Sequence, residues 1–318
     1  MRLFKRKRAE KTKELYIEKD DRWLRVKALN FFGHYSTSPD GQYILSWADT
    51  DQSGQRGGFR DSGHGSYVLA YEDQLILTGN MERPNDGRVA NNGNFVINDW
   101  MFGEGLKGIF YAIDKNGTVL IRHVFKANLL NTGISPDGVF AVCQTCHSDT
   151  PDGNLLCLFD LCVGKMLWYI NPETGWAQDY SFYIEQSVIH VQHEAFGEFR
   201  YNLKSGEFLD RDRWIEQRTK HGSGFDLLSI AEERIAQLAE SSSEANIPEI
   251  IDLLKTALTR GLTNYPNQQA IIYRHLGELW ERLGDKSTAI GNYEQAIKCN
   301  PNVGVKRRLN QLKQSLEK

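Results

Sequence analysis

The residues best suited to chemistry lie mid-chain, where four cysteines stand within twenty residues. Cys143 is followed three residues later by Cys146, which directly precedes His147. Cys157 and Cys162 come shortly after. A C-x-x-C-H string is the attachment pattern of c-type haem, and two cysteine pairs that meet in space can hold zinc. Cys143 and Cys157, however, alternate with apolar residues as core strand positions do, and free cysteine is among the most buried residue types. We therefore expect core packing and no cofactor, with zinc as the alternative.

A second candidate is the glycine-rich segment from Asp49 to Gly65, which contains Arg56 and Arg60. Backbone N–H groups and guanidinium groups of such a segment could bind phosphate. The preferred interpretation is a surface loop, since long insertions of this composition connect strands. The sequence contains no H-E-x-x-H, no G-x-S-x-G and no Gly-Lys-Ser/Thr phosphate loop. We assign no residue a catalytic role and expect the protein not to be an enzyme.

Composition places the chain among ordinary globular proteins. Of its 318 residues 40% are apolar and 25% charged, and the length suits two domains. The net charge of -3 gives no overall attraction to nucleic acid or anionic membrane. No segment approaches the ~18 apolar residues of a membrane span. Residues 1–13 are strongly basic but have no apolar signal-peptide core behind them. We expect a flexible tail and a cytoplasmic protein, with binding of nucleic acid or anionic lipid by the tail as the alternative.

The residue pattern changes character near residue 215. Before that point, short β-rich runs alternate with turns of Gly, Asn, Asp and Pro; after it, apolar residues recur at helical spacing. The pattern predicts a multidomain β-then-α chain, with a β domain over 14–215, a linker over 216–225 and a helical domain over 226–318.

A turn repeats through the β half. Ser38–Gly41 and Ser135–Gly138 both read Ser-Pro-Asp-Gly, and Asn91–Gly93 reads Asn-Asn-Gly, each directly before a β-rich run. Glycine supplies the positive φ of a tight turn, proline presets the turn entry, and Asp or Asn can bond its own backbone. The final glycines of the three turns are 52 and 45 residues apart. This spacing suits four-stranded antiparallel β repeats.

The two Ser-Pro-Asp-Gly turns, and the string from Phe159 to Trp168, resemble WD40-type and related β-propeller repeats over about 200 residues. The resemblance implies propeller-like sheets, each with four strands. Four units and a leading hairpin are fewer than the usual seven, and a ring must close or cap its edges. An irregular stacked or sandwiched antiparallel domain stays open as the alternative.

The segment from Ala270 to Pro301 resembles a tetratricopeptide (TPR) repeat. Small residues at Gly277, Ala289 and Ala296 would let two antiparallel helices approach, and Pro301 would end the second. The remaining positions that match the repeat are Tyr273, Leu276, Trp280, Gly284 and Tyr293. Residues 226–262 resemble a degenerate second repeat, and 303–316 a capping helix.

The TPR resemblance implies that the first helix of each repeat lines a protein-binding face. Carried onto this sequence, the groove-facing residues are Ile271, Arg274, Glu278, Glu281 and Arg282. The favoured function is a non-catalytic adaptor or scaffold for a protein partner that the sequence does not identify, with self-association possible through the helices. The alternatives are an enzyme that uses the cysteine cluster or the Asp49–Gly65 loop, and a nucleic-acid-associated protein that uses the basic tail.

Overall fold

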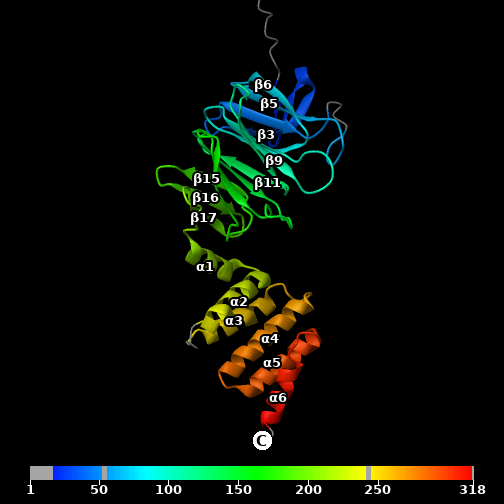
Figure 1. Cartoon of the computed structure of the whole chain (residues 1–318), viewed down its shortest axis with the longest axis vertical. Helices are drawn as coiled ribbons and strands as arrows, with labels where there is room; N and C mark the ends of the chain where they lie inside the picture. The colour runs from blue at the N-terminus through cyan, green and yellow to red at the C-terminus, as the bar shows by residue number, and fades with distance from the viewer. Residues whose placement is uncertain (1–16, 52–55, 241–244, 317–318) are drawn as a thin grey trace, which may run out of the picture. The chain divides into compact units, whose positions relative to one another are not determined.

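The computed structural model describes residues 17–51, 56–240 and 245–316, and the chain divides into two compact units. The first, Met1–Leu209, holds the β-strands, and the second, Asp210–Lys318, holds the α-helices (Figure 1). The basic segment 1–13 lies outside the described residues.

The β unit contains four antiparallel sheets in chain order. The first sheet has the strands β1 (Ile17–Lys19), β2 (Trp23–Val26), β3 (Phe31–Thr37), β4 (Tyr43–Ala48), β5 (Gly65–Tyr71) and β6 (Gln74–Met81), with a short 3-10 helix, η1 (Lys27–Leu29), between β2 and β3. The second has β7 (Pro84–Val89), β8 (Phe95–Asp99), β9 (Gly108–Ile113) and β10 (Val119–Phe125). The third has β11 (Leu129–Ile134), β12 (Phe140–Thr145), β13 (Leu156–Asp160) and β14 (Lys165–Ile170), and the fourth has β15 (Asp179–Tyr183), β16 (Val188–His193) and β17 (Gly197–Asn202).

Four strands per sheet is therefore correct for the second and third sheets and wrong for the other two. The leading hairpin β1–β2 joins the first sheet and brings it to six strands. The fourth sheet has three strands, with a single bridge from Tyr201 to Phe208 in place of a fourth.

The repeated turn has the same local structure at both of its Ser-Pro-Asp-Gly sites. The hydroxyl of Ser38 accepts a hydrogen bond from the N–H of Tyr43 (2.9 Å), and the hydroxyl of Ser135 accepts one from Phe140 (2.9 Å). The final glycine, Gly138 in the second turn, has a φ of +72°, which L residues rarely adopt. The sequence thus encodes the start of β4 and of β12 in the same way.

Successive sheets pack against each other through apolar side chains. Leu45 and Trp47 of the first sheet share a buried cluster with Phe95 of the second. A second cluster joins the second sheet to the third, with Phe110 stacked on Phe159 at a centroid distance of 4.6 Å. The inner strands also meet, since β11 contacts both β7 and β15.

The two ends of the sheet array are finished differently. On the outer face of the first sheet, Leu24 and Val26 of the leading hairpin share a buried cluster with Val68. On the fourth sheet, Tyr180 is buried on one face, whereas the cross-strand row of Ser181, His190 and Arg200 on the other face is polar. A polar outer face lets a stack of repeats end in water.

The helical unit has, in its described part, the helices α1 (Arg211–His221), α2 (Gly224–Glu240), α3 (Ile247–Thr259), α4 (Pro266–Arg282), α5 (Lys286–Cys299) and α6 (Lys306–Leu316). The linker predicted for residues 216–225 is wrong, because α1 and the start of α2 occupy it. Trp214 of α1 is buried, and the Arg260 guanidinium donates to the carbonyls of Thr219 (3.0 Å) and Lys220 (3.2 Å) at the C-terminal end of α1.

Close packing of α4 on α5 depends on Gly277. A Cβ at this position would lie 2.6 Å from the Tyr293 ring, so only glycine fits without movement. Asp285 caps α5 by accepting from the N–H of Thr288 (3.0 Å). These contacts hold two antiparallel helices side by side and fix the direction in which the residues of α4 point.

Candidate protein-binding groove

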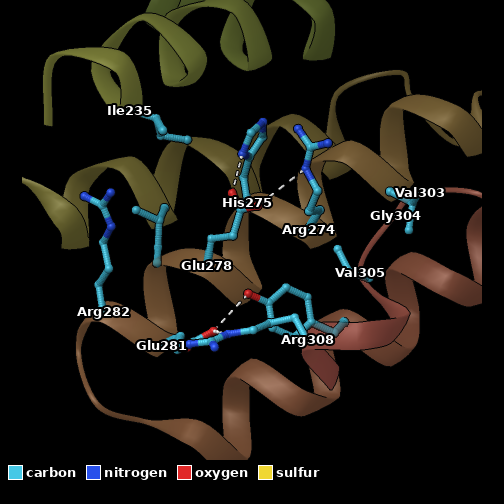
Figure 2. A pocket seen from close by; sticks show the side chains of 12 residues that line it. Ile235, Arg274, His275, Glu278, Glu281, Arg282, Val303, Gly304, Val305 and Arg308 are labelled. Carbon is cyan, nitrogen blue, oxygen red and sulfur yellow. Dashed lines mark hydrogen bonds and ion pairs between the residues drawn. The ribbon is translucent and has the colours of Figure 1, made fainter. Parts of the chain in front are cut away.

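A groove of about 660 Å³ lies among α2, α4, α5 and the segment that leads into α6. It contains four of the five residues predicted from the sequence, Arg274, Glu278, Glu281 and Arg282 (Figure 2). The fifth, Ile271, does not line the groove but packs against the buried cluster that α2, α3 and α4 share.

The periodicity of the α-helix explains why the predicted residues lie on the same side of α4. Residues three and four apart in a helix lie on one face, so Arg274, Glu278 and Arg282 form a row along α4. Ile272 and Leu276 point into the core instead. Because these apolar residues fix the orientation of α4, the charged row on its other side lies at the groove.

Glu278 is the electrostatic centre of this row. Its carboxylate lies 3.1 Å from His275 Nδ1 and 3.7 Å from Arg274 Nε. Burial by itself would raise the pKa of Glu278, but the hydrogen bond and charge of His275, with the neighbouring arginines, hold it below its ordinary value. His275 Nε2 also lies 3.5 Å from Glu232 of α2, so the ring joins α2 to α4.

Glu281 is engaged within the protein. It forms an ion pair with Arg308 of α6, whose Nε donates to it at 2.9 Å, and it accepts a hydrogen bond from the Tyr293 hydroxyl (3.2 Å). Burial, with the nearby charge of Glu278, raises the pKa of Tyr293 to about 12. Tyr293 therefore stays protonated, and Glu281 ties α4 to α6.

The arginines of α4 are not fully engaged. Arg274 Nε and His275 Nε2 are buried and make no hydrogen bond within the described part of the chain. Arg282 is exposed and forms neither a hydrogen bond nor an ion pair with a described residue. A buried donor without a hydrogen bond is costly, so Arg274 Nε is a donor that lacks an acceptor in the described part of the groove.

His275 and Arg308 are among the groove residues that sequence reasoning missed. The spacing of His275 from Glu278, three residues along a helix, was a usable signal. The contact between Arg308 and Glu281 spans 27 positions and depends on how α6 packs, so no local signal indicates it.

The four clustered cysteines do not all meet at one point. Cys143 and Cys157 are direct cross-strand partners on β12 and β13, and both are fully buried in the apolar cluster between the second and third sheets. Burial raises the pKa of the Cys143 thiol, and the neighbouring thiol adds to this. Both fit the core-packing interpretation.

Cys146 and Cys162 lie at opposite ends of the β12–β13 hairpin. Cys146 follows β12 next to the start of β13, whereas Cys162 follows β13 beyond the start of β12. A tetrahedral site needs all four sulfurs around one ion. Across the residues that the structure describes, no group of three or more His, Cys, Asp or Glu side chains is arranged to hold a metal.

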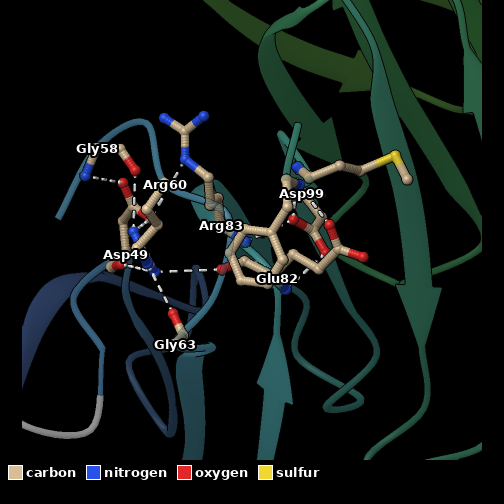
Figure 3. Close-up of polar contacts among 9 residues, drawn as sticks. Asp49, Gly58, Arg60, Gly63, Glu82, Arg83 and Asp99 are labelled. Atoms are coloured by element: carbon tan, nitrogen blue, oxygen red, sulfur yellow. Dashed lines mark hydrogen bonds and ion pairs between the residues drawn. The ribbon is translucent and has the colours of Figure 1, made fainter. Parts of the chain in front are cut away.

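The glycine-rich loop is closed by Arg60 (Figure 3). Its guanidinium donates to the Asp49 carboxylate (2.8 Å), the Gly63 carbonyl (2.7 Å) and the Gly58 carbonyl (3.0 Å). The Arg60 side chain is 7% exposed. Arg60 is therefore committed to holding the loop, which disfavours the alternative that its guanidinium binds phosphate. Arg56 is exposed, and residues 52–55 lie outside the described residues.

The N-terminal basic segment also lies outside the described residues, so the nucleic-acid alternative stays a prediction. Among the described helices, none has both the length and the apolar character needed to cross a bilayer.

Comparison with known proteins shows a distant structural likeness among solved structures. No protein-family model matches the chain, and no curated protein matches it. The crystal structure of BamB from Moraxella catarrhalis is similar with a TM-score of 0.37 and 11% sequence identity, over 55% of this chain and 47% of that one. The chain thus spans about half the length of that structure.

Proposed function

We propose that this protein is a non-catalytic adaptor or scaffold that recognises a protein partner through the α4 groove. In this proposal the helical unit is a short TPR-type array, with α2–α3 and α4–α5 as its repeats and α6 as the cap. The β unit is a propeller-like array whose loops are held by a rigid frame. The TPR-type spacing and the close approach at Gly277 support a TPR-type array. The repeated turns support a propeller-like β unit.

The incomplete bonding of the groove arginines is the observation that carries the proposal. Arg274 and Arg282 present donors that no described carboxylate fully satisfies, while Glu278 lies between them. A partner segment that places one carboxylate against each arginine would complete these bonds, and charge-assisted hydrogen bonds of this kind are the strong ones. The preferred partner is a polypeptide with acidic side chains spaced along it.

The proposal is tested by quantitative affinity capture with the full chain as bait. Partners that the unmodified protein retains should be lost from the variant with Arg274→Ala and Glu278→Ala together. The matched control carries Glu294→Ala and Lys313→Ala, which removes an exposed α5–α6 ion pair of 2.6 Å outside the groove. The control should keep every partner, because exposed ion pairs contribute little to stability. Thermal unfolding of both variants checks that they are folded.

Retention of all partners by the folded Arg274/Glu278 variant would overturn groove recognition. Equal loss from both variants would also count against it, because that result indicates a general effect of altering the helical unit.

A further inference from the structure

The charged row on α4 alternates in sign. Arg274, Glu278 and Arg282 follow one another four residues apart, and Figure 2 shows them in that order along the helix. Four residues of an α-helix rise by about 6 Å along its axis. The row therefore presents a positive, a negative and a second positive group at a regular interval along the groove.

Each charge of this row is open to a further partner. The side chains of Arg274 and Glu278 are 35% and 47% exposed, and the ion pair between them is long at 3.7 Å. Arg274 Nε makes no hydrogen bond to a described residue. Arg282 is exposed and pairs with no described residue. A ligand that lies along α4 can thus meet all three charges.

An extended polypeptide matches the interval of the row. Alternate side chains of a strand point to the same side and are about 6.6 Å apart. Over the two steps of the row, the mismatch with the helix is about 1.2 Å, which long arginine side chains can absorb. In a helical ligand, by contrast, acidic and basic residues four apart pair with each other and gain less from the row.

We propose that the α4 groove recognises an extended segment in which an acidic, a basic and a second acidic residue alternate with uncharged ones. This inference rests on the proposed function and gives its acidic partner a pattern. The acidic side chains pair with Arg274 and Arg282, and the basic one between them pairs with Glu278. A basic residue at either end, or an acidic one in the middle, would meet a like charge, which discriminates against other sequences.

Peptides of equal composition test the pattern. Two fluorescein-labelled, end-capped peptides carry the core Asp-Ser-Lys-Ser-Asp or its permutation Asp-Asp-Lys-Ser-Ser between glycines. Fluorescence anisotropy measures their binding to the full chain at low ionic strength, where charge pairs are least screened. The alternating peptide should bind about tenfold more tightly, because the permutation takes one carboxylate away from its arginine.

A variant of the row tests the register. Arg282→Glu should reverse the preference at one end, so that a peptide with lysine in place of one terminal aspartate binds best. The end at which this happens gives the direction of the peptide. Because Arg282 is exposed and unpaired among the described residues, the variant should stay folded, which thermal unfolding checks. The matched control is Lys298→Glu, an equal change of charge at an exposed site of α5 outside the groove, and it should keep the original preference.

The pattern would be overturned if neither peptide binds, if both bind equally, or if Arg282→Glu leaves the preference unchanged. Tighter binding of a cross-linked helical peptide with the same charges four residues apart would overturn the extended conformation. The proposed function is judged separately, because loss of captured partners from the Arg274/Glu278 variant does not depend on which peptide binds. Loss of those partners together with equal peptide affinities would refute the pattern alone.

Discussion

Arg60 in the β unit and the arginines of the α4 groove are the same residue type in opposite situations. The Arg60 guanidinium has acceptors from Asp49, Gly58 and Gly63 around it. Arg274 retains a buried Nε without a hydrogen bond, and Arg282 is exposed without an ion pair to any described residue. A guanidinium whose donors are satisfied holds its own chain together, whereas one with free donors is available to a ligand. Bonding state, and not residue type, separates the structural site from the proposed binding site.

The largest expected effect on stability comes from removing Arg60, the arginine that is bonded within its own loop. Arg60→Ala should destabilise the β unit by about 3 kcal/mol, because it leaves Asp49 and the loop carbonyls without their buried donor. Chemical denaturation followed by tryptophan fluorescence measures the change. Arg56→Ala in the same loop is the control and should change stability by less than about 0.5 kcal/mol. Equal effects of the two substitutions would show that Arg60 does not hold the loop.

A smaller effect is expected at the contact that places the groove. Gly277→Ala should destabilise the helical unit by about 1 to 2 kcal/mol, since its methyl group would overlap the Tyr293 ring. Gly291→Ala on α5 is the matched control. A Cβ there meets nothing within 4 Å, so helix propensity should stabilise the unit by about 0.5 to 1 kcal/mol. Thermal unfolding should shift in opposite directions for the two variants, and a shift of both toward higher temperature would refute the close approach.

The smallest expected effect is on the pH dependence of stability, and it concerns Glu278 in the α4 groove. The pKa of Glu278 is lower in the folded protein than in the unfolded chain. Its contribution to stability is therefore present above the unfolded value of about 4.5 and is lost as the pH falls toward the lowered pKa. Glu278→Gln should remove this part of the acid destabilisation, which thermal unfolding across that range measures. An unchanged pH dependence in the variant would mean that Glu278 is not stabilised as an anion.

Local sequence was sufficient where structure depends on neighbours in the chain. The Ser-Pro-Asp-Gly turns were predicted from residue types, and their bonds run within five residues of Ser38 and of Ser135. Four residues of the groove were predicted from the TPR resemblance, and helical spacing explains why they lie on one side of α4. Ile271 was assigned to the groove from the same resemblance, but it packs against the buried cluster instead.

The wrong linker prediction involves a partner that is distant in sequence. The segment 216–225 reads as a linker because it is polar, yet α1 forms there, with Arg260 donating to carbonyls at its end from 40 positions away. The sequence left phosphate binding by Arg56 or Arg60 open as an alternative, and only the structure shows the acceptors that engage Arg60, among them a carbonyl from Glu82.

The sequence by itself determined the turns, the β-then-α order and the charged row on α4, because these follow from local backbone preferences and helical periodicity. Only the tertiary structure decided how the cysteines lie relative to one another and which arginines are satisfied. Those outcomes depend on burial and on hydrogen-bond partners that packing brings together from distant parts of the chain.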